Sequence, residues 1–353
     1  MSFAAISIGE RRVGEREPVL VIAEAGVNHD GEVNAALALV DAAADAGADV
    51  VKFQTFVPAA LTVANAPLAD YQRDRVAGPR GQRSMLEGLC LSAADLAAVA
   101  ARCERRGIAF LSTPFDLDSA TLLERIGVPA FKVASSELTN LPFLHALALR
   151  GKPLIVSTGM ATLREVDEAV DVLHDAGVPF VLLHCVSAYP VPAEQANVRA
   201  IDTLRASFGV PVGYSDHCLG HDASLAAVAR DACVLERHLT LDRKQPGPDH
   251  AMSLEPDGFR ELVRRVRAIE AALGDGRKVP QPAEQGTRAV ARRSIVAARA
   301  LAAGETLTAD TLAVKRPGGG LAPARLVELI GTRLARPLRA DEQLTEAHLE
   351  LRA

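Results

Sequence analysis

Two lysines and a set of hydroxyl side chains stand at the ends of short apolar stretches of the chain. Lys52 and Lys132 each lie within or just after such a stretch, and Ser135, Ser157 and Ser215 occupy similar places. Ammonium groups together with hydroxyl donors suit a phosphate and a neighbouring carboxylate. The sequence has no G-x-x-x-x-G-K-[ST] motif, so this grouping does not predict a nucleotide P-loop.

Two histidines, His217 and His238, end two successive apolar stretches. Two imidazoles with water or substrate oxygens make an open site for a divalent ion, which can polarise a carbonyl group. The same histidines could equally be structural groups held by hydrogen bonds. The residues by themselves leave both interpretations open.

Three carboxylates complete the set of candidate reactive groups. Glu24 and Glu137 are candidates for moving protons and handling water. Asp249 lies in the turn Pro246-Gly-Pro-Asp249, where it could accept a hydrogen bond from a sugar hydroxyl. A phosphate grip, a Lewis acid and carboxylates together indicate carbon–carbon bond formation between a phosphorylated pyruvate-like donor and an aldehyde. Spacing alone names neither substrate.

These residues follow eight short strand-like runs that alternate with Ala- and Leu-rich helical stretches. The runs are mostly continuous in apolar residues, as expected for parallel strands covered on both faces. Eight such units in about 275 residues predict a (β/α)8 TIM barrel, in which the carboxyl ends of the strands carry the chemistry. The predicted strands are Val19–Ala23, Val50–Phe53, Ala109–Ser112, Ala130–Ala134, Leu154–Ser157, Phe180–His184, Val210–Tyr214 and Cys233–Glu236.

Local signals support this division and leave one alternative. Ser92 with Asp95, and Thr162 with Glu165, predict capped helix starts. A doubly wound open sheet would also alternate strands and helices, but its first turn is normally rich in glycine. The first turn here reads Glu24-Ala-Gly-Val-Asn-His29 instead.

The barrel pattern ends near Gly274, and the rest of the chain has a different organisation. We assign residues 1–276 to the barrel, 277–286 to a linker and 287–353 to a small second domain. In that domain residues 301–312 recur as residues 338–349, and each copy predicts a short strand, a turn and a short capped helix. About 70 residues make a marginal core, so we expect this domain to lean on another part of the assembly.

The composition excludes several classes of protein. A net charge of −5 argues against nucleic acid or an anionic membrane as the main partner. No apolar run approaches the ~20 residues that span a bilayer, and the start of the sequence lacks a signal pattern. Five cysteines without a C-x-x-C pair suit a reducing compartment. We therefore expect a soluble cytoplasmic protein.

The motifs at the predicted strand ends, taken in order, resemble those of the sialic acid (nonulosonate) synthase family. The resemblance covers nearly the whole chain. The segment with Arg293-Ser-Ile-Val-Ala297 and Lys315-Arg-Pro-Gly318 is similar to the antifreeze-like (SAF) domain of that family. The matching barrel motifs are Ile22-Ala-Glu-Ala-Gly-Val-Asn-His-Asp-Gly31, Lys52-Phe-Gln-Thr55, Ser112-Thr-Pro-Phe-Asp116, Lys132-Val-Ala-Ser-Ser-Glu137, Ser157-Thr-Gly-Met160, Tyr214-Ser-Asp-His217, Glu236-Arg-His238 and Pro246-Gly-Pro-Asp249.

The resemblance implies a metal-dependent transferase, N-acetylneuraminate synthase. Such an enzyme condenses phosphoenolpyruvate with N-acetylmannosamine and water and releases phosphate through cleavage of the C–O bond. It further implies that His217 and His238 hold a manganese-type ion, or Mg2+ or Co2+, that activates the sugar aldehyde. Glu24 would lie beside the reacting carbons and manage the attacking water.

The resemblance also divides the remaining residues between the two substrates. The donor would contact Lys52, Thr113, Lys132, Ser135, Ser157, Ser187 and Ser215. The amino sugar would contact Gln54, Phe115, Glu137, Tyr189 and Asp249. In a homodimer, the SAF domain of one subunit would cap the barrel of the other and bring Arg316 to the N-acetyl group.

Other interpretations remain at this stage. A legionaminic or pseudaminic acid synthase would use a diacetamido-trideoxy hexose as the acceptor. A Schiff-base pyruvate aldolase would explain Lys132 but not the two histidines. A sugar- or ice-binding protein acting through the SAF domain would leave the polar strand ends without a purpose.

Overall fold

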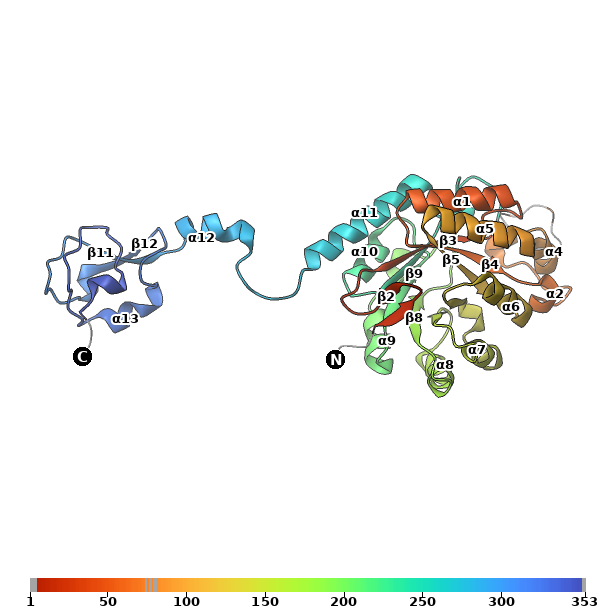
Figure 1. Ribbon diagram of the computed structural model, residues 1–353, viewed down its shortest axis with the longest axis horizontal. Coiled ribbons are helices and arrows are strands. Elements are labelled where there is room, and N and C mark those ends of the chain that lie inside the picture. The colour runs from red at the N-terminus through yellow and green to blue at the C-terminus, as the bar shows by residue number, and fades with distance from the viewer. Residues whose placement is uncertain (1–4, 74, 76–77, 79–80, 351–353) are drawn as a thin grey trace. The chain divides into compact units, whose positions relative to one another are not determined.

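The computed structural model describes residues 5–73, 75, 78 and 81–350. The chain divides into two compact units, Met1–Gly274 and Asp275–Ala353, and each is described by itself (Figure 1). Among the described residues, no helix combines the length and the apolar composition needed to cross a bilayer.

Eight parallel strands form the centre of the first unit, in the order β5-β4-β3-β10-β9-β8-β7-β6. The two end strands, β5 and β6, lie beside each other, so the sheet curls into a near-closed barrel. This consecutive order confirms the predicted barrel and excludes a doubly wound sheet. The strands are β3 Leu20–Gly26, β4 Val50–Thr55, β5 Ala109–Pro114, β6 Phe131–Val133, β7 Leu154–Ser157, β8 Phe180–Cys185, β9 Val212–Asp216 and β10 Val234–His238.

Helices surround the barrel (Figure 1). Both predicted capping boxes form, because Ser92 and Thr162 each exchange hydrogen bonds with the residue three positions later. The segment after β4 is longer than the other connections and holds three short helices, α2 Pro58–Leu61, α3 Asp70–Arg73 and α4 Gln82–Glu87. The remaining helices are α1 Val33–Asp45, α5 Ala93–Arg106, α6 Leu117–Ile126, α7 Leu141–Ala148, α8 Leu163–Asp175, α9 Ala200–Phe208, α10 Asp222–Val228 and α11 Pro256–Leu273.

A short hairpin closes the amino-terminal end of the barrel. Its strands, β1 Ile6–Ile8 and β2 Arg11–Val13, pair antiparallel. Ile8 and Val13 pack with the apolar side chains at the starts of the barrel strands, such as Leu20 and Val50. Since that end is filled with apolar groups, polar side chains inside the barrel can gather only toward the carboxyl ends of the strands.

The second unit has its own small core, which includes Ile295, Leu307 and Leu344. It contains α12 Gln285–Ala291, the antiparallel strands β11 Ser294–Ala297 and β12 Leu312–Lys315, and α13 Leu326–Leu329. The predicted linker holds one 3-10 turn, Pro282–Glu284, before α12 begins.

The internal repeat of the second unit has a structural counterpart. Leu301 and Leu338, which match between the two copies, pair with each other through N–H···O bonds of 2.9 and 3.0 Å. Each copy ends in a one-turn 3-10 helix, Ala309–Thr311 or Glu346–His348, and each of these follows a capping threonine. The two copies therefore form one core together, rather than two separate ones.

Candidate active site

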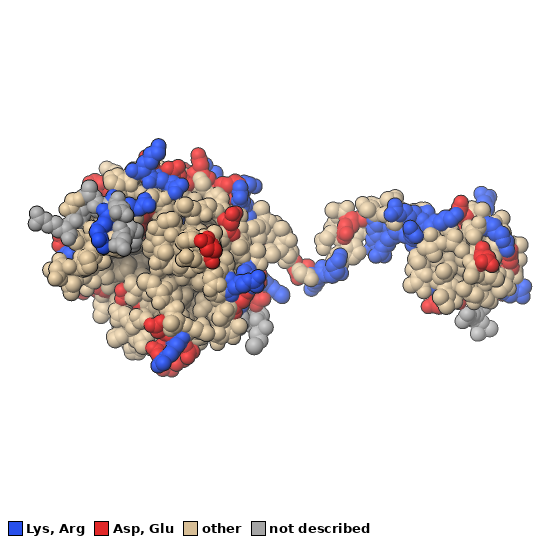
Figure 2. Space-filling model, turned by 180° about the vertical axis from the view of Figure 1, so that it is seen from behind, with Lys and Arg blue, Asp and Glu red and all other residues tan. Residues whose placement is uncertain are grey.

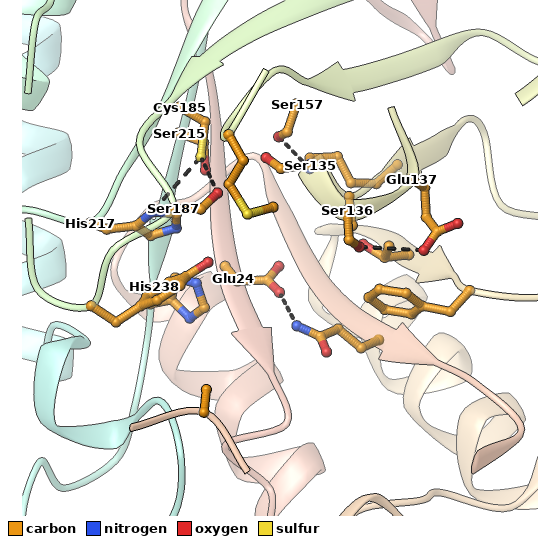
Figure 3. A pocket seen from close by; sticks show the side chains of 18 of the residues that line it. Glu24, Ser135, Ser136, Glu137, Ser157, Cys185, Ser187, Ser215, His217 and His238 are labelled. Atoms are coloured by element: carbon orange, nitrogen blue, oxygen red, sulfur yellow. Dashed lines mark hydrogen bonds between the residues drawn. The ribbon is translucent and has the colours of Figure 1, made fainter. Parts of the chain in front are cut away.

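A cavity of about 590 Å³ opens at the carboxyl ends of the barrel strands. Apart from Asp249 and Arg316, every residue that the sequence assigned to a site lines it. Figure 3 shows His217 and His238 on one side of this space, with Ser187 and Ser215 next to His217, and Ser136 and Glu137 on the other side. The assigned residues in its wall are Glu24, Lys52, Gln54, Thr113, Phe115, Lys132, Ser135, Glu137, Ser157, Ser187, Tyr189, Ser215, His217 and His238.

Four buried charges form the floor of the cavity. Lys52 is in direct contact with the Glu24 carboxylate, and its Nζ lies 3.7 Å from Glu236 Oε2. Lys132 Nζ lies 3.6 Å from Glu236 Oε1, so Glu236 stands between the two lysines. Hydroxyl groups complete the network, because Lys52 donates to Thr113 Oγ1 and Lys132 to Ser157 Oγ. Buried charges persist only with such partners.

The four groups titrate differently because their surroundings differ. Burial raises the pKa of Glu24 to about 7, against the lowering effect of the Lys52 ammonium. Burial also opposes the charge on Glu236, but Lys132 and Lys52 outweigh it and lower the Glu236 pKa. Burial lowers the pKa of Lys132 despite the attraction of Glu236. One carboxyl of the pair is therefore firmly ionised, while the other is poised to exchange a proton near neutral pH.

Serine hydroxyls converge beside Lys132. The Gly159 N–H donates to Ser135 Oγ at 3.0 Å. A Cβ at Gly159 would lie 2.7 Å from Ser135 Oγ and would clash with Ser187 Oγ, so only glycine lets these groups approach. Ser157 and Ser215 come from the ends of β7 and β9 and line the same region. Several hydroxyl donors around a buried ammonium suit a phosphate-sized anion.

The two histidines face each other across the rim of the cavity, with ring centroids 5.4 Å apart. His217 Nδ1 donates to the Val186 carbonyl oxygen at 2.9 Å, which in the neutral ring leaves the lone pair on Nε2. Burial, followed by the charge of His217, lowers the pKa of His238 well below its usual value, so that ring is neutral.

Burial opposes a proton on His217, but the contacts with the Cys185 sulfur and the Val186 carbonyl outweigh it and raise the pKa of that ring. In its neutral form, His217 is oriented through Nδ1 and suits metal ligation. His238 Nδ1 is buried and has no hydrogen-bond partner among the described residues. No group of three or more His, Cys, Asp or Glu in the described part of the chain is arranged to hold a metal. An ion here would therefore need oxygens from substrate or water to complete its coordination.

The opposite wall of the cavity mixes polar and apolar groups. Gln54 donates to Glu24 Oε1 at 3.4 Å. Glu137 is held by Asn140 Nδ2 at 2.9 Å and by Ser136 Oγ at 3.3 Å. Apolar side chains from the long segment after β4 complete this wall, and they are Leu61, Met85 and Leu86.

Asp249 is not among the residues that line the cavity, and Arg316 belongs to the second unit. Asp249 is buried, with Oδ2 3.9 Å from His238 Nδ1. A Cβ at Gly26 would lie 3.1 Å from Glu24 Oε1 and 3.7 Å from Asp249 Oδ2, so the two carboxylates approach the same point, one from β3 and one from the loop after β10. Arg316 is exposed on the second unit.

Glu236 and Cys185 also line the cavity, although neither was assigned a role from the sequence. Glu236 balances the charges of both lysines. The sequence contained a signal for its place, because Glu236 stands two residues before His238 and therefore shares its face of β10. Cys185, one of the five cysteines, was given no role in the site. It lines the cavity with its Sγ 3.8 Å from His217 Nδ1, a contact that sequence spacing does not predict.

Comparison with known proteins decides the family. The NeuB family model matches residues 39–278, and the SAF domain model matches residues 292–350. The chain belongs to the NeuB family. The resemblance seen in the motifs is thereby confirmed, together with the SAF domain.

Relatives in the NeuB family extend over nearly the full chain. The chain is 42% identical to N,N'-diacetyllegionaminic acid synthase of Campylobacter jejuni, over 93% of this chain and 99% of the relative. It is 40% identical to the protein of the same name from Legionella pneumophila, over 96% of each. The crystal structure of N-acetylneuraminic acid synthetase from Leptospira borgpetersenii, in complex with citrate, superposes with a TM-score of 0.72 at 35% identity, covering 81% of this chain and 95% of that one.

Proposed function

We propose that the protein is a nonulosonic acid synthase. It condenses phosphoenolpyruvate with an N-acetylated amino sugar and water, and it releases phosphate by cleavage of the C–O bond. The observation that carries this proposal is one cavity in which a lysine–serine anion site, two histidines and Glu24 meet. The names of the three relatives described above, which are synthases of legionaminic or neuraminic acids, support it.

The donor binds on the lysine side. Lys132 and the hydroxyls of Ser135, Ser157, Ser187 and Ser215 hold the phosphate, and Lys52 with Thr113 holds the carboxylate. Because the lysines already contact Glu24 and Glu236, they are fixed before the anion arrives. Such preorganisation lowers the cost of binding and of charge development.

The reacting centre lies between Glu24 and the histidines. His217 and His238 each have an imidazole that fits a divalent ion of the manganese type, which polarises the sugar aldehyde when bound. Glu24 takes a proton from the water that attacks the pyruvyl carbon, a role that a carboxylate with a pKa near neutrality can perform. Gln54, Phe115, Glu137, Tyr189 and Asp249 surround the sugar.

The identity of the sugar has two candidates. The sequence motifs imply N-acetylmannosamine. The apolar wall of Leu61, Met85 and Leu86 favours the second candidate, a diacetamido-trideoxy hexose, because that sugar replaces hydroxyl groups with a methyl and an acetamido group. The legionaminic acid synthases among the relatives agree with this choice.

A panel of amino sugars with phosphoenolpyruvate tests the proposal, with phosphate release as the measurement. We expect release with a diacetamido-trideoxy hexose, a lower kcat/KM with N-acetylmannosamine, and loss of activity after chelation that manganese restores. If none of the amino sugars supports phosphate release, the proposed synthase activity is refuted. Full activity in strong chelator would refute the proposed metal requirement. Trapping of pyruvate on a lysine by borohydride would favour the aldolase instead.

The proposal includes a homodimer in which the second unit of one subunit caps the barrel of the other. Figure 2 shows Lys and Arg side chains gathered on the second unit, and the exposed ones include Arg288, Arg292, Arg293, Lys315 and Arg316. The described residues that line the cavity include no arginine. A partner's Arg316 would supply one for the carbonyl oxygen of the N-acetyl group.

A further inference from the structure

A fully buried histidine that the mechanism does not use follows directly after Asp249. His250 Nδ1 lies 2.6 Å from Thr240 Oγ1. Its Nε2 lies 3.1 and 3.2 Å from the two carboxylate oxygens of Asp30. Asp30 belongs to the turn between β3 and α1, whereas Thr240 and His250 belong to the loop between β10 and α11. The imidazole therefore ties together two loops that lie on neighbouring strands.

The turn before Asp249 is shaped around this pair. Gly247 has a φ of 158°, a conformation that side chains rarely adopt. A Cβ there would lie 2.6 Å from His250 Cδ2 and 3.0 Å from Asp30 Oδ1. The backbone of Pro246-Gly-Pro-Asp249 thus packs directly on the His250–Asp30 contact, so its path depends on that contact.

A second set of hydrogen bonds holds Asp249 from the other side. Ser253 Oγ donates to the Asp249 carbonyl oxygen at 2.6 Å, and Asn28 Nδ2 donates to Ser253 Oγ at 2.9 Å. Asn28, like Asp30, lies in the turn after β3, the strand that carries Glu24. The main chain of Asp249 is thereby fixed to the same turn at two points, while its carboxylate stays free to face His238 and the region of Glu24.

We propose that His250 and Asp30 form a latch that positions Asp249 for the amino sugar. His250 is a positioning residue, since it touches neither substrate and acts through the turn that it supports. This inference rests on the proposed function, which assigns the amino sugar to Asp249. The latch fixes the position of Asp249 relative to Glu24, because the two loops that it joins follow β3 and β10. These neighbouring strands pair with Glu24 opposite His238.

Kinetics of variants test the latch. Asp30→Ala removes the partner from the partly exposed side of the contact, and His250→Phe keeps a ring but no polar atoms. We expect each to raise the KM for the amino sugar roughly ten- to a hundredfold, the loss that a small misplacement of a binding group causes. The KM for phosphoenolpyruvate should stay within about twofold, since the donor side touches neither loop. His174→Gln, which alters a histidine packed on Phe180 outside the barrel, is the matched control and should change neither constant.

A double-variant cycle separates a positioning role from a general loss of structure. In an Asp249→Ala background, Asp30→Ala should have little further effect on the KM for the sugar, because the group that it positions is gone. Amide hydrogen exchange in residues 245–250 should be faster in Asp30→Ala than in the parent enzyme.

The inference and the proposed function fail in different ways. Equal rises in both KM values, or additive effects in the double variant, would overturn the positioning role. Unchanged exchange in residues 245–250 of Asp30→Ala would overturn the latch itself. A parent enzyme that releases no phosphate with any amino sugar would overturn the proposed function, whatever the exchange shows.

Discussion

Two lysines and two glutamates share the floor of the cavity, and their charges balance when all four groups are ionised. Anionic phosphoenolpyruvate must therefore be bound by ammonium groups that are already in contact with carboxylates. The raised pKa of Glu24 resolves this competition. While Glu24 is protonated, its neutral carboxyl does not compensate the charge of the Lys52 ammonium, which can then attract the anionic substrate. Glu236 remains the ionised partner of both lysines.

The pH dependence of the reaction follows from this residue. Below about pH 7 the Glu24 carboxyl is protonated and cannot take a proton from water; above it the carboxylate can, so kcat should rise through that region. Glu24→Gln should lower kcat roughly 10²- to 10⁴-fold and abolish the rise. Initial rates of both enzymes, measured from about pH 5.5 to about pH 8.5 at intervals of about 0.5, give the pH dependence. If the Glu24→Gln enzyme showed the same rise with pH, another titrating group would be responsible for it.

Gly159 offers a second test at the scale of one residue. Gly159→Ala places a methyl group against the Ser135 and Ser187 hydroxyls. We expect the KM for phosphoenolpyruvate to rise roughly tenfold, the effect of losing one or two charge-assisted hydrogen bonds, with the KM for the sugar unchanged. Gly258→Ala is the control, because a Cβ there would lie 3.7 Å from its nearest neighbour, a side-chain atom of Leu254, which is an ordinary contact distance. An unchanged donor KM would remove the serines from the phosphate site.

At the scale of elements, β9 and β10 present different chemistry on their two faces. Ser215 and His217 face the cavity with Glu236 and His238, whereas Asp216 and Arg237 form a buried ion pair 3.0 Å apart. Arg237 also donates to the Asp216 carbonyl oxygen at 3.2 Å and to the carbonyl of Cys218. The ion pair thus anchors the chain on both sides of His217.

Breaking this pair should cost far more than breaking a surface pair. Arg237→Met leaves the Asp216 carboxylate buried without its cation, so we expect the free energy of unfolding to fall by about 3–5 kcal/mol. Arg260→Met removes an exposed pair with Asp257 and should cost less than about 1 kcal/mol. Urea unfolding followed by circular dichroism compares the two. Equal losses would mean that the buried pair has no special role.

The elements could be predicted because their signals are local. Parallel strands buried on both faces leave continuous apolar runs, and capping boxes mark where α5 and α8 begin. The β1–β2 hairpin has three-residue strands and no such run, so it was not predicted. The candidate residues were predicted to gather because strand ends meet at one face. The bridging place of Glu236 was not predicted, since it depends on side-chain reach across the barrel from β10 to Lys132 on β6.

At the scale of the whole molecule, the two units have separate cores, yet the barrel cavity shows no arginine among its described lining residues. The second unit exposes several. Its core is built by two copies of one repeat, which pair at Leu301 and Leu338. No residue of α12 is buried in this unit. A partner's barrel would give these exposed arginines a function.

Mixing two impaired variants tests the exchange of domains between subunits. Arg316→Ala alone should raise the KM for the sugar, and Glu24→Gln alone should stop turnover. In a homodimer with exchanged caps, a mixed dimer holds one site with both an intact Glu24 and a partner's intact arginine. Random reassembly after co-expression should therefore recover about a quarter of the parental sites, because half of the dimers are mixed and each has one complete site. If Arg316 acts within its own chain, no mixed dimer holds a complete site, and the recovered activity would not exceed that of the Arg316→Ala enzyme in the mixture.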